Sequence, residues 1–279
     1  MKIAVTGATG FVGQYVVQEL IRQNINVIAI SRHKSSLWQD NKLVKTICLD
    51  IDNYDPNVFE QIECPKTLIH LAWPGLQDYN STIHTETVPK HLRFLTSCIE
   101  SGLKQLIVIG TCLEYGVQDG ELNESSPIKP STAYGIAKNK LRIGLETLQQ
   151  QNYFELSWLR LFYLYGIGQS EKSLYSQLSK VVESGGAEFK MSQGDQTRDF
   201  IAVENVACLI ITIAKKNKGE GIINICSGLP VSVETMVRKW LFLKNANIKL
   251  NLGFFPYPEY EARHFWGARN KLNSILEQK

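Results

Sequence analysis

Long hydrophobic runs and clustered charge are both missing from this chain of 279 residues. The longest apolar run, VACLIITIA at 206–214, is far shorter than a membrane span, and the N-terminal MKIAVTGATG has too short an apolar part for a signal peptide. The formal net charge is only +3, without a long run of lysine or arginine. We therefore expect a cytoplasmic protein without a membrane or nucleic-acid partner, although an anionic ligand remains open.

Cysteine is scarce and widely spaced. The six residues form no CxxC pair, and most lie in apolar stretches typical of core elements. This pattern predicts reduced, buried thiols rather than a disulfide framework, and it predicts no metal site. The cysteines are Cys48, Cys64, Cys98, Cys112, Cys208 and Cys226.

Strand-length apolar runs alternate with segments of helical period over the first 164 residues. Continuous Val/Ile/Leu strands of this kind are typical of a parallel sheet covered by helices on both faces. We predict an α/β protein with a Rossmann-type, doubly wound parallel sheet over 1–164, to which the chain returns near 199–226. Segments 165–198 and 227–279 would form a smaller, interleaved substrate-binding lobe, with loops at 166–169 and 185–195.

A glycine-rich segment, GATGFVG at 7–13, directly follows the first apolar run. It fits G-x-x-G-x-x-G, a variant of the dinucleotide fingerprint at a strand-to-helix junction. Gly7 would allow the tight turn, Gly10 the approach of a pyrophosphate, and Gly13 the packing of helix on sheet. The alternative is a turn that binds nothing, but its position favours a cofactor. The rest of the predicted contact set is Thr9, Phe11 and Val12.

The end of the second predicted strand bears on which dinucleotide binds. Ser31 and Arg32 stand where an acidic residue would hold the ribose hydroxyls of NAD. Without a carboxylate, and with a guanidinium available for a 2′-phosphate, NADP(H) is favoured and NAD(H) remains possible. The alternative is that Arg32 is simply an exposed loop cation. Asp50 and Ile51, at the end of the third strand, are expected to flank the adenine.

A Tyr-x-x-x-Lys pair, Tyr134 and Lys138, lies in a predicted helix after the fifth strand. Side chains at this spacing share one helix face, so the ammonium could lower the pKa of the phenol and hold a ribose while the phenol exchanges a proton. Thr111 stands at the carboxyl end of the preceding strand, where open α/β sheets bind ligands. Such pairs also occur in ordinary surface helices, and it is the position that favours catalysis.

Taken together, the motifs resemble the extended short-chain dehydrogenase/reductase family, and more narrowly its branch that acts on nucleotide-activated sugars. They occur in order along nearly the whole chain. The motifs are TGATGFVG at 6–13, HLAW at 70–73, GTCLEYG at 110–116, the Tyr134/Lys138 pair, RLFYLYG at 160–166, RDFIAVENVA at 198–207 and NICSG at 224–228.

The resemblance implies roles for individual residues. Thr111 would hydrogen-bond the reacting sugar oxygen, Tyr134 would donate the proton, and Lys138 would tune the phenol and hold the ribose. Arg198 would bind the diphosphate of the sugar nucleotide, unless it forms a structural ion pair with Asp199 or Glu204. The end of the fourth strand would line the dinucleotide, and its tryptophan would also wall the sugar pocket. Those residues are Leu71, Ala72 and Trp73.

The same resemblance distinguishes between reactions. Family dehydratases carry an Asp-Glu pair directly after the threonine, where this chain has Cys112 and Leu113. The usual asparagine of the R-x-x-N-x-Y-G segment is replaced by Tyr163, which puts the usual sugar-nucleotide contacts there in doubt. The combination of RLFYLYG at 160–166, Gly168-Gln169 and the tail PYPEYEARHFWG at 256–267 is similar to bacterial 4-keto-6-deoxyhexose reductases of the dTDP-fucose and CDP-abequose type, which serve surface polysaccharides. The alternatives are a 4-epimerase with tightly bound NAD and a non-catalytic NADP-binding sensor.

The aromatic C-terminal segment has no clear periodicity. Its Arg263 and His264 are candidate phosphate partners, while His70, on the fourth strand, is expected beneath the cofactor. By resemblance, helices near 87–101 and 131–150 would pair two copies into a homodimer. The tail aromatics, which either wall the base and sugar or pack a small lobe, are Tyr257, Tyr260, Phe265 and Trp266.

Overall fold

The computed structural model describes residues 2–257 and 262–278, and its centre is a parallel sheet of seven strands in the order β11-β7-β5-β4-β1-β2-β3. Most of these strands are buried along nearly their whole length because both sheet faces are covered. The strands are β1 (Lys2–Thr6), β2 (Asn26–Ser31), β3 (Val44–Cys48), β4 (Thr67–His70), β5 (Gln105–Thr111), β7 (Glu155–Leu161) and β11 (Gly221–Ile225).

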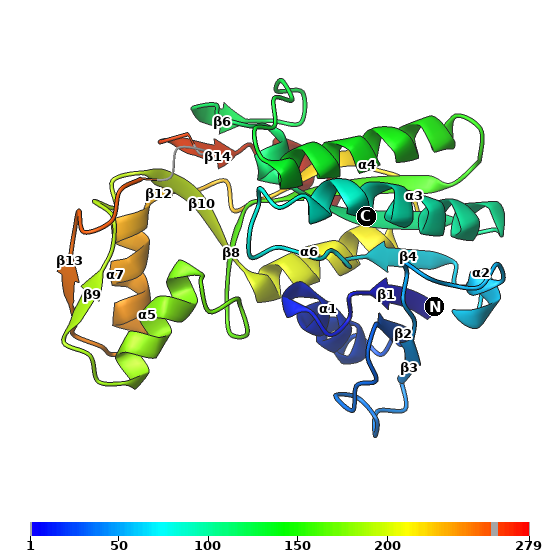
Figure 1. Ribbon diagram of the computed structural model, residues 1–279, viewed down its shortest axis with the longest axis horizontal. Coiled ribbons are helices and arrows are strands. Elements are labelled where there is room, and N and C mark those ends of the chain that lie inside the picture. Colours follow the sequence, from blue (N-terminus) through cyan, green and yellow to red (C-terminus); the bar gives the residue numbers. More distant parts are fainter. Residues whose placement is uncertain (1, 258–261, 279) are drawn as a thin grey trace.

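Helices cover the two faces of this sheet, as Figure 1 shows. One core is formed with α1 (Phe11–Arg22), α6 (Val203–Lys215) and α8 (Asn270–Glu277). The other is formed with α2 (Val58–Gln61), α3 (Ile83–Glu100) and α4 (Ala133–Gln149). The predicted doubly wound α/β fold is confirmed.

The strand order reverses between β1 and β4. The chain builds β1, β2 and β3 outward in one direction, then returns to place β4 on the other side of β1, with Thr6 opposite His70. The loop after β1 therefore leads to α1 on one face of the sheet, and the loop after β4 leads to α3 on the other face. In open α/β sheets such a switch point leaves a crevice at the carboxyl ends of the strands.

A smaller part of the molecule lies beyond the carboxyl ends of the parallel strands, around α5 (Leu174–Glu183) and α7 (Val233–Leu243) (Figure 1). Its core includes Leu178, Val237 and Trp240. The predicted loop at 185–195 is wrong in part, because it contains β9. The strands of this smaller part are β8 (Tyr163–Tyr165), β10 (Thr197–Ala202) and β12 (Pro230–Ser232) in one sheet, and β9 (Glu188–Lys190) with β13 (Lys249–Asn251). Near the C-terminus, β14 (Phe265–Gly267) pairs with β6 (Gly120–Leu122) from the earlier part of the chain.

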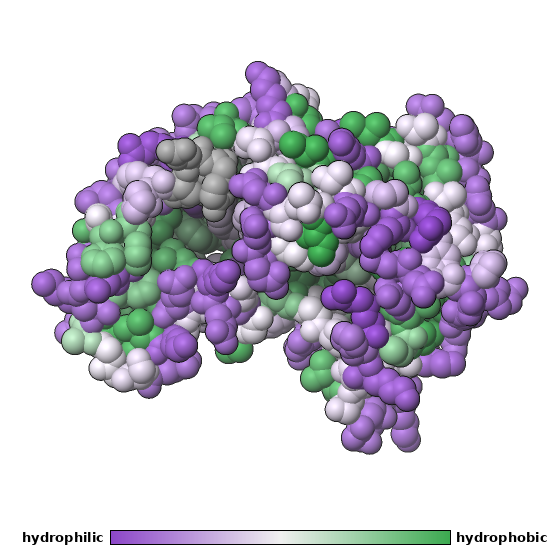
Figure 2. All heavy atoms as spheres, in the orientation of Figure 1, coloured by the Kyte–Doolittle hydropathy of each residue, from purple (hydrophilic) through white to green (hydrophobic). Residues whose placement is uncertain are grey.

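The surface seen in Figure 2 is mostly hydrophilic, with apolar residues in small groups, and is indented between the smaller part and the main body. Cys48, Cys64 and Cys208 are exposed, so the expectation that most cysteines are buried is wrong. Each of these three cysteines is next to a buried residue in the sequence, but its own side chain faces solvent. No helix within 2–257 or 262–278 combines the length and apolar character needed to cross a bilayer.

Candidate functional site

A cavity of about 800 Å³ lies at the carboxyl ends of the parallel strands. It is bounded by the turn after β1, the ends of β2, β4 and β5, the start of α4 and the segment after β8. The structure thus brings together most of the predicted site residues on one surface. Those lining the cavity are Gly7, Thr9, Gly10, Phe11, Val12, Gly13, Ser31, Arg32, Ile51, Leu71, Ala72, Trp73, Thr111, Cys112, Leu113, Tyr134, Lys138 and Tyr163.

The glycine turn has the geometry that a diphosphate requires. Gly7 has φ +66°, and a Cβ there would lie 2.7 Å from the Ala72 nitrogen. A Cβ on Gly13 would lie 2.1 Å from the Gly7 carbonyl oxygen, so α1 packs directly on its own turn. Gly10 precedes α1 and supplies no side-chain cap. The first-turn amides of α1 are therefore available to an anion, which fits a dinucleotide pyrophosphate.

Tyr134 and Lys138 enter the cavity from the first turns of α4. Thr132 begins this helix by accepting a 3.1 Å hydrogen bond from the Gly135 amide. The Tyr134 amide donates to the Tyr79 carbonyl at 2.9 Å, and the two rings stack with centroids 5.4 Å apart. The Lys138 ammonium donates to the carbonyl of Ile109 at 2.8 Å, which fixes the lysine to the end of β5.

Burial dominates the titration of this pair. It lowers the pKa of Lys138 to about 7, against the opposing effect of the Glu114 carboxylate. It also raises the pKa of Tyr134 well above its ordinary value. The expectation that the ammonium lowers the phenol pKa does not hold here, because desolvation of the phenolate is the larger effect. The phenol thus carries its proton over the whole neutral range.

Thr111 combines the end of β5 with the start of a short 3-10 turn, η1 (Cys112–Glu114). Its Oγ1 accepts a hydrogen bond from the Leu113 amide at 3.2 Å, while its own amide donates to Glu114 Oε1 at 2.9 Å. This capping box fixes both the backbone and the side chain of Thr111. Since the hydroxyl oxygen accepts from Leu113, its hydrogen can be donated to an oxygen in the cavity.

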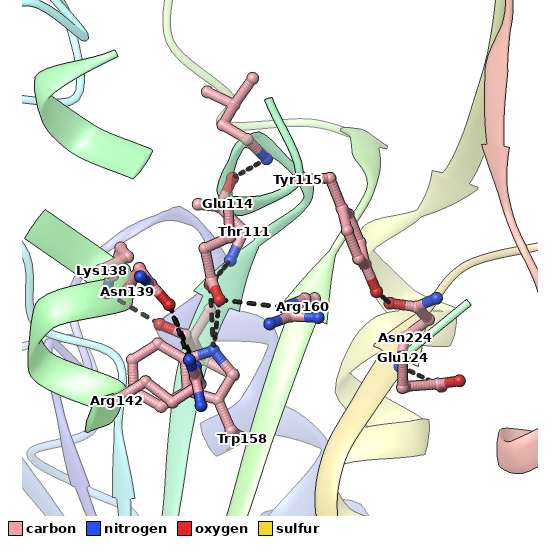
Figure 3. Close-up of polar contacts among 12 residues, drawn as sticks. Thr111, Glu114, Tyr115, Glu124, Lys138, Asn139, Arg142, Trp158, Arg160 and Asn224 are labelled. Carbon is pink, nitrogen blue, oxygen red and sulfur yellow. Dashed lines mark hydrogen bonds and ion pairs between the residues drawn. The ribbon is translucent and has the colours of Figure 1, made fainter. Parts of the chain in front are cut away.

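A buried polar network lies beneath Thr111 (Figure 3). Glu114 and Arg160 are both 0% exposed and form an ion pair at 2.9 Å, and Trp158 Nε1 donates to the same carboxylate at 2.9 Å. A Cβ on Gly110 would lie 2.5 Å from Glu114 Oε1, so only glycine leaves room for the carboxylate there. Paired buried charges of this kind hold a strand end in one geometry.

Three buried histidines support the floor and wall of the cavity, and sequence reasoning anticipated only His70 among them. His70, at the end of β4, is fully buried between Thr6 Oγ1 and His91 Nδ1, at 2.9 Å from each. His91 lines the cavity, and burial lowers its pKa to about 3, so it is neutral. His84 is also buried and accepts a 3.0 Å hydrogen bond from Trp73 Nε1.

Sequence reasoning also missed two segments of the cavity wall. One follows β4, and the other follows β8. The first could have been found, because a loop that leaves a central strand at its carboxyl end lies beside the switch point. The second belongs to the smaller part, whose position the sequence does not indicate. The missed lining residues include Pro74, Leu76, Gln77, Asp78, Tyr79, Asn80, Gln169, Ser170, Lys172 and Ser173.

The structure corrects the prediction for Asp50. Strand β3 ends at Cys48, two residues earlier than that prediction required, so Asp50 is exposed and does not line the cavity. Ile51, which was predicted together with Asp50, does line the cavity, and so does Asp52. The Asp52 carboxylate is 3.1 Å from the Lys90 ammonium.

Two predicted phosphate-binding arginines also lie outside the cavity lining. Arg198 is buried, its guanidinium donates to the carbonyls of Thr197 and Arg263 at 2.8 and 2.9 Å, and it lies 4.8 Å from the Phe265 ring centroid. Arg263 is exposed, 3.6 Å from Asp195. Arg198 packs against the Phe265 ring, and Arg263 lies near the Asp195 carboxylate. The position of an arginine in the sequence does not reveal such contacts.

The remaining tail residues pack between the two parts of the molecule, where Phe265 joins a core cluster with Tyr115 and Phe162. Phe265 is buried, and His264 Nδ1 lies 3.2 Å from Thr197 Oγ1. Tyr257 is 4.2 Å from the Arg263 guanidinium, measured to the ring centroid, and Trp266 is half-buried in β14. Tyr260 lies outside the described residues.

A model of the NAD dependent epimerase/dehydratase family matches residues 3–226. The chain belongs to this family. It is 32% identical over 274 residues to dTDP-6-deoxy-L-talose 4-dehydrogenase (NAD(+)) of Aggregatibacter actinomycetemcomitans, covering 96% of this chain and 100% of the relative. CDP-abequose synthase of Salmonella typhimurium is 27% identical, over 77% of this chain and 71% of the relative. The predicted resemblance to extended short-chain dehydrogenase/reductases is thereby confirmed.

Solved structures share the fold. MoeE5 in complex with UDP-glucuronic acid and NAD superposes with a TM-score of 0.84 at 24% identity, covering 99% of this chain and 92% of that one. UDP-glucuronic acid 4-epimerase from Bacillus cereus, in complex with UDP-glucuronic acid and NAD, gives 0.84 at 22% identity, over 100% and 94% of the two chains. These two likenesses show the fold, while the family model and the 32% identical relative show that the chain is an enzyme of the NAD dependent epimerase/dehydratase family.

Proposed function

We propose that this protein reduces the C4 ketone of a nucleotide-linked 4-keto-6-deoxyhexose with NADPH, and that the nucleotide is dTDP. One observation carries the proposal: Thr111, Tyr134 and Lys138 line the same cavity as the glycine turn after β1. Two relatives, a dTDP-6-deoxy-L-talose 4-dehydrogenase and a CDP-abequose synthase, support a deoxysugar substrate.

The glycine turn after β1 and Lys138 would hold a nicotinamide dinucleotide, which when bound would supply the hydride for the sugar carbon. Thr111 donates a hydrogen bond to the ketone oxygen, and Tyr134 gives that oxygen its phenolic proton. The ketone thereby gains one hydride and one proton and becomes an alcohol, after which the phenol recovers a proton from solvent. Lys138, anchored at Ile109, holds the nicotinamide ribose and offsets the charge of the transient phenolate.

The side chains next to Thr111 favour reduction over dehydration. Cys112 and Leu113 line the cavity where an acid and a base would be required to expel water from the sugar. The Cys112 thiol and the Leu113 alkyl side chain do not supply that acid and base. Reduction with a hydride from the dinucleotide would require from the protein only a hydrogen-bond donor and a proton donor for the ketone oxygen, and Thr111 and Tyr134 line the cavity.

The preference for NADPH rests on the end of β2. Arg32 is exposed and lines the cavity, and Ser31 Oγ donates to the carbonyl of His33 at 2.8 Å. The nearby Asp52 carboxylate is paired with Lys90, which reduces its repulsion of a phosphate. Arg32 can therefore pair with a 2′-phosphate.

We further propose that the two parts of the molecule bind different ligands. Residues 1–164, with the returns near 199–226, bind the cofactor, and 165–198 with 227–279 bind the sugar nucleotide. Two copies pair through the helices near 87–101 and 131–150. Exposed thiols at Cys48, Cys64 and Cys208 fit a reducing cytoplasm.

The test follows NADPH absorbance with dTDP-, CDP-, GDP- and UDP-linked 4-keto-6-deoxyhexoses and identifies the product by NMR. We expect oxidation of NADPH and a new C4 alcohol with the dTDP sugar. Interconversion of C4 epimers of a nucleotide sugar with no net oxidation would instead establish the 4-epimerase alternative. Cofactor binding without turnover of any nucleotide sugar would establish the sensor.

A further inference from the structure

Trp73 lies directly beneath the ammonium group of Lys138. The Lys138 Nζ is 3.9 Å from the centroid of the indole ring, a distance typical of a cation held on an aromatic face. Trp73 follows the end of β4, whereas Lys138 comes from α4. Two elements that are far apart in the sequence therefore meet at this contact.

The indole ring is itself fixed by His84. Trp73 Nε1 donates to His84 Nδ1 at 3.0 Å, so His84 carries its hydrogen on Nε2, which donates to the Asp78 carbonyl at 2.8 Å. The rings of Trp73 and His84 are nearly parallel, at 17°. Donation from the indole N–H leaves the ring face more electron-rich, which strengthens its attraction for a cation.

The other groups that face Lys138 show why such a contact matters. Glu114 of η1 favours the ammonium, whereas His91 of α3 and His70 of β4 are buried and neutral. Tyr134, on the same helix, keeps its proton and brings no charge. Burial therefore disfavours the charged form of Lys138. The Glu114 carboxylate, the Ile109 carbonyl and the indole face together stabilise that charge.

We propose that Trp73, held in place by His84, is the positioning residue that keeps Lys138 charged and directed into the cofactor side of the cavity. This inference rests on the proposed role of Lys138 in binding the dinucleotide. It goes beyond the contact of Trp73 with cofactor or sugar, because it predicts an effect on Lys138 before any sugar binds.

The experiment measures the Kd of NADPH by fluorescence as a function of pH, without a sugar. In the unaltered protein we expect affinity to fall as pH rises through about 7, where Lys138 loses its proton. Without an aromatic face the ammonium is less stable, so its pKa drops. Trp73→Leu should move the midpoint down by about 0.5–1 pH unit, whereas Trp73→Phe, which keeps a π face, should move it by less than half of that.

Three controls make the result decisive. Lys138→Met should abolish the fall in affinity as pH rises through about 7, and if that fall persists, another group causes it and the inference fails. Trp240→Leu removes a buried tryptophan from the smaller part, so it reproduces general destabilisation and should leave the midpoint unmoved. Thermal unfolding of each variant shows that it is folded.

An unchanged midpoint in Trp73→Leu, or equal shifts in the leucine and phenylalanine variants, would overturn the inference. Failure of the proposed function is a separate result. If no ketosugar is reduced but the midpoint moves as expected, the role of Trp73 stands and only the substrate is wrong.

Discussion

Tyr134 and Lys138 show that burial, more than proximity, sets the charge state of this pair. The sequence spacing suggested an ammonium that makes the phenol more acidic. In the folded protein, burial raises the pKa of Tyr134 and lowers that of Lys138 to about 7. A proton donor that keeps its proton at neutral pH suits the reduction of a ketone, because the proton is needed only as charge develops on the oxygen.

Replacing Tyr134 by phenylalanine tests this assignment. We expect turnover to fall at least about 100-fold, because the general acid is lost, while NADPH affinity changes less than about threefold. Steady-state kinetics and fluorescence titration measure the two quantities. Turnover equal to that of the unaltered enzyme would show that another group supplies the proton.

Arg32 carries the prediction for cofactor choice. Arg32→Ala should lower kcat/KM for NADPH by roughly 10- to 100-fold, the loss expected for one charge-assisted hydrogen bond, and leave NADH unaffected. Lys34→Ala is the matched control, because Lys34 is an exposed cation of the same loop outside the cavity lining. An equal loss with both cofactors would mean that Arg32 does not bind the 2′-phosphate.

The sequence was informative about residues whose positions are set by the backbone. Gly7 and Thr111 lie at strand ends, and Tyr134 and Lys138 share one face of a helix. Spacing in the sequence therefore suffices to place all four at the carboxyl ends of the parallel strands. Arg198 differs, because its long side chain lies on the Phe265 ring, supplied by a segment more than sixty residues away. Such contacts depend on tertiary packing.

At the scale of elements, the junction of β5, η1 and β7 depends on one buried ion pair. Glu114→Ala should destabilise the protein by about 3–5 kcal/mol, because it leaves the Arg160 guanidinium buried without its carboxylate. Adding Arg160→Met should recover most of that loss. Denaturant unfolding of the two single variants and the double variant gives the coupling energy, and additive losses would show that the pair does not interact.

The junction of β1 and α1 makes a second prediction. Gly13→Ala places a Cβ 2.1 Å from the Gly7 carbonyl oxygen, so α1 must shift. We expect a loss of about 1–3 kcal/mol in stability and at least about tenfold weaker NADPH binding. Gly144→Ala in α4 is the matched control, since its nearest contact is the flexible Leu92 side chain at 3.0 Å. If the two variants behave alike, the close packing of α1 on its turn is unimportant.

Elements of the large sheet could be predicted because their sequences are locally decisive. Strand β5 is buried along its whole length and rich in Ile and Val, and α1 buries a single face. Strand β9 was missed because only Phe189 of its three residues is buried, and its partner β13 lies about sixty residues further along the chain. Short strands of this kind are defined by their pairing.

At the scale of the whole molecule, the interleaving of the two parts was only partly predictable. Strand β11 returns to the large sheet beside β7, and β14 pairs with β6 from far earlier in the chain. The local sequence of Gly221–Ile225 indicates a strand but not its neighbour. Pairing between distant segments is chosen by the packing of the complete core, which no single window of sequence contains.

The outer face of α4 leads to a prediction about assembly. Ile143 is 48% exposed there, and Ile136 on the same helix is 38% exposed. Exposed aliphatic side chains on a long helix fit the proposed homodimer, in which a second copy would cover them. A charge at this position would then be buried without a partner, which costs several kcal/mol and favours the monomer.

Ile143→Glu should therefore convert a dimer to a monomer in analytical ultracentrifugation, with the fold preserved in circular dichroism. Phe242→Glu is the matched control, because Phe242 is 78% exposed on α7, in the smaller part and away from α3 and α4. That variant should remain dimeric. If both variants keep the mass of a dimer, the interface lies elsewhere, and if the unaltered protein is monomeric, the two isoleucines are simply solvent-exposed.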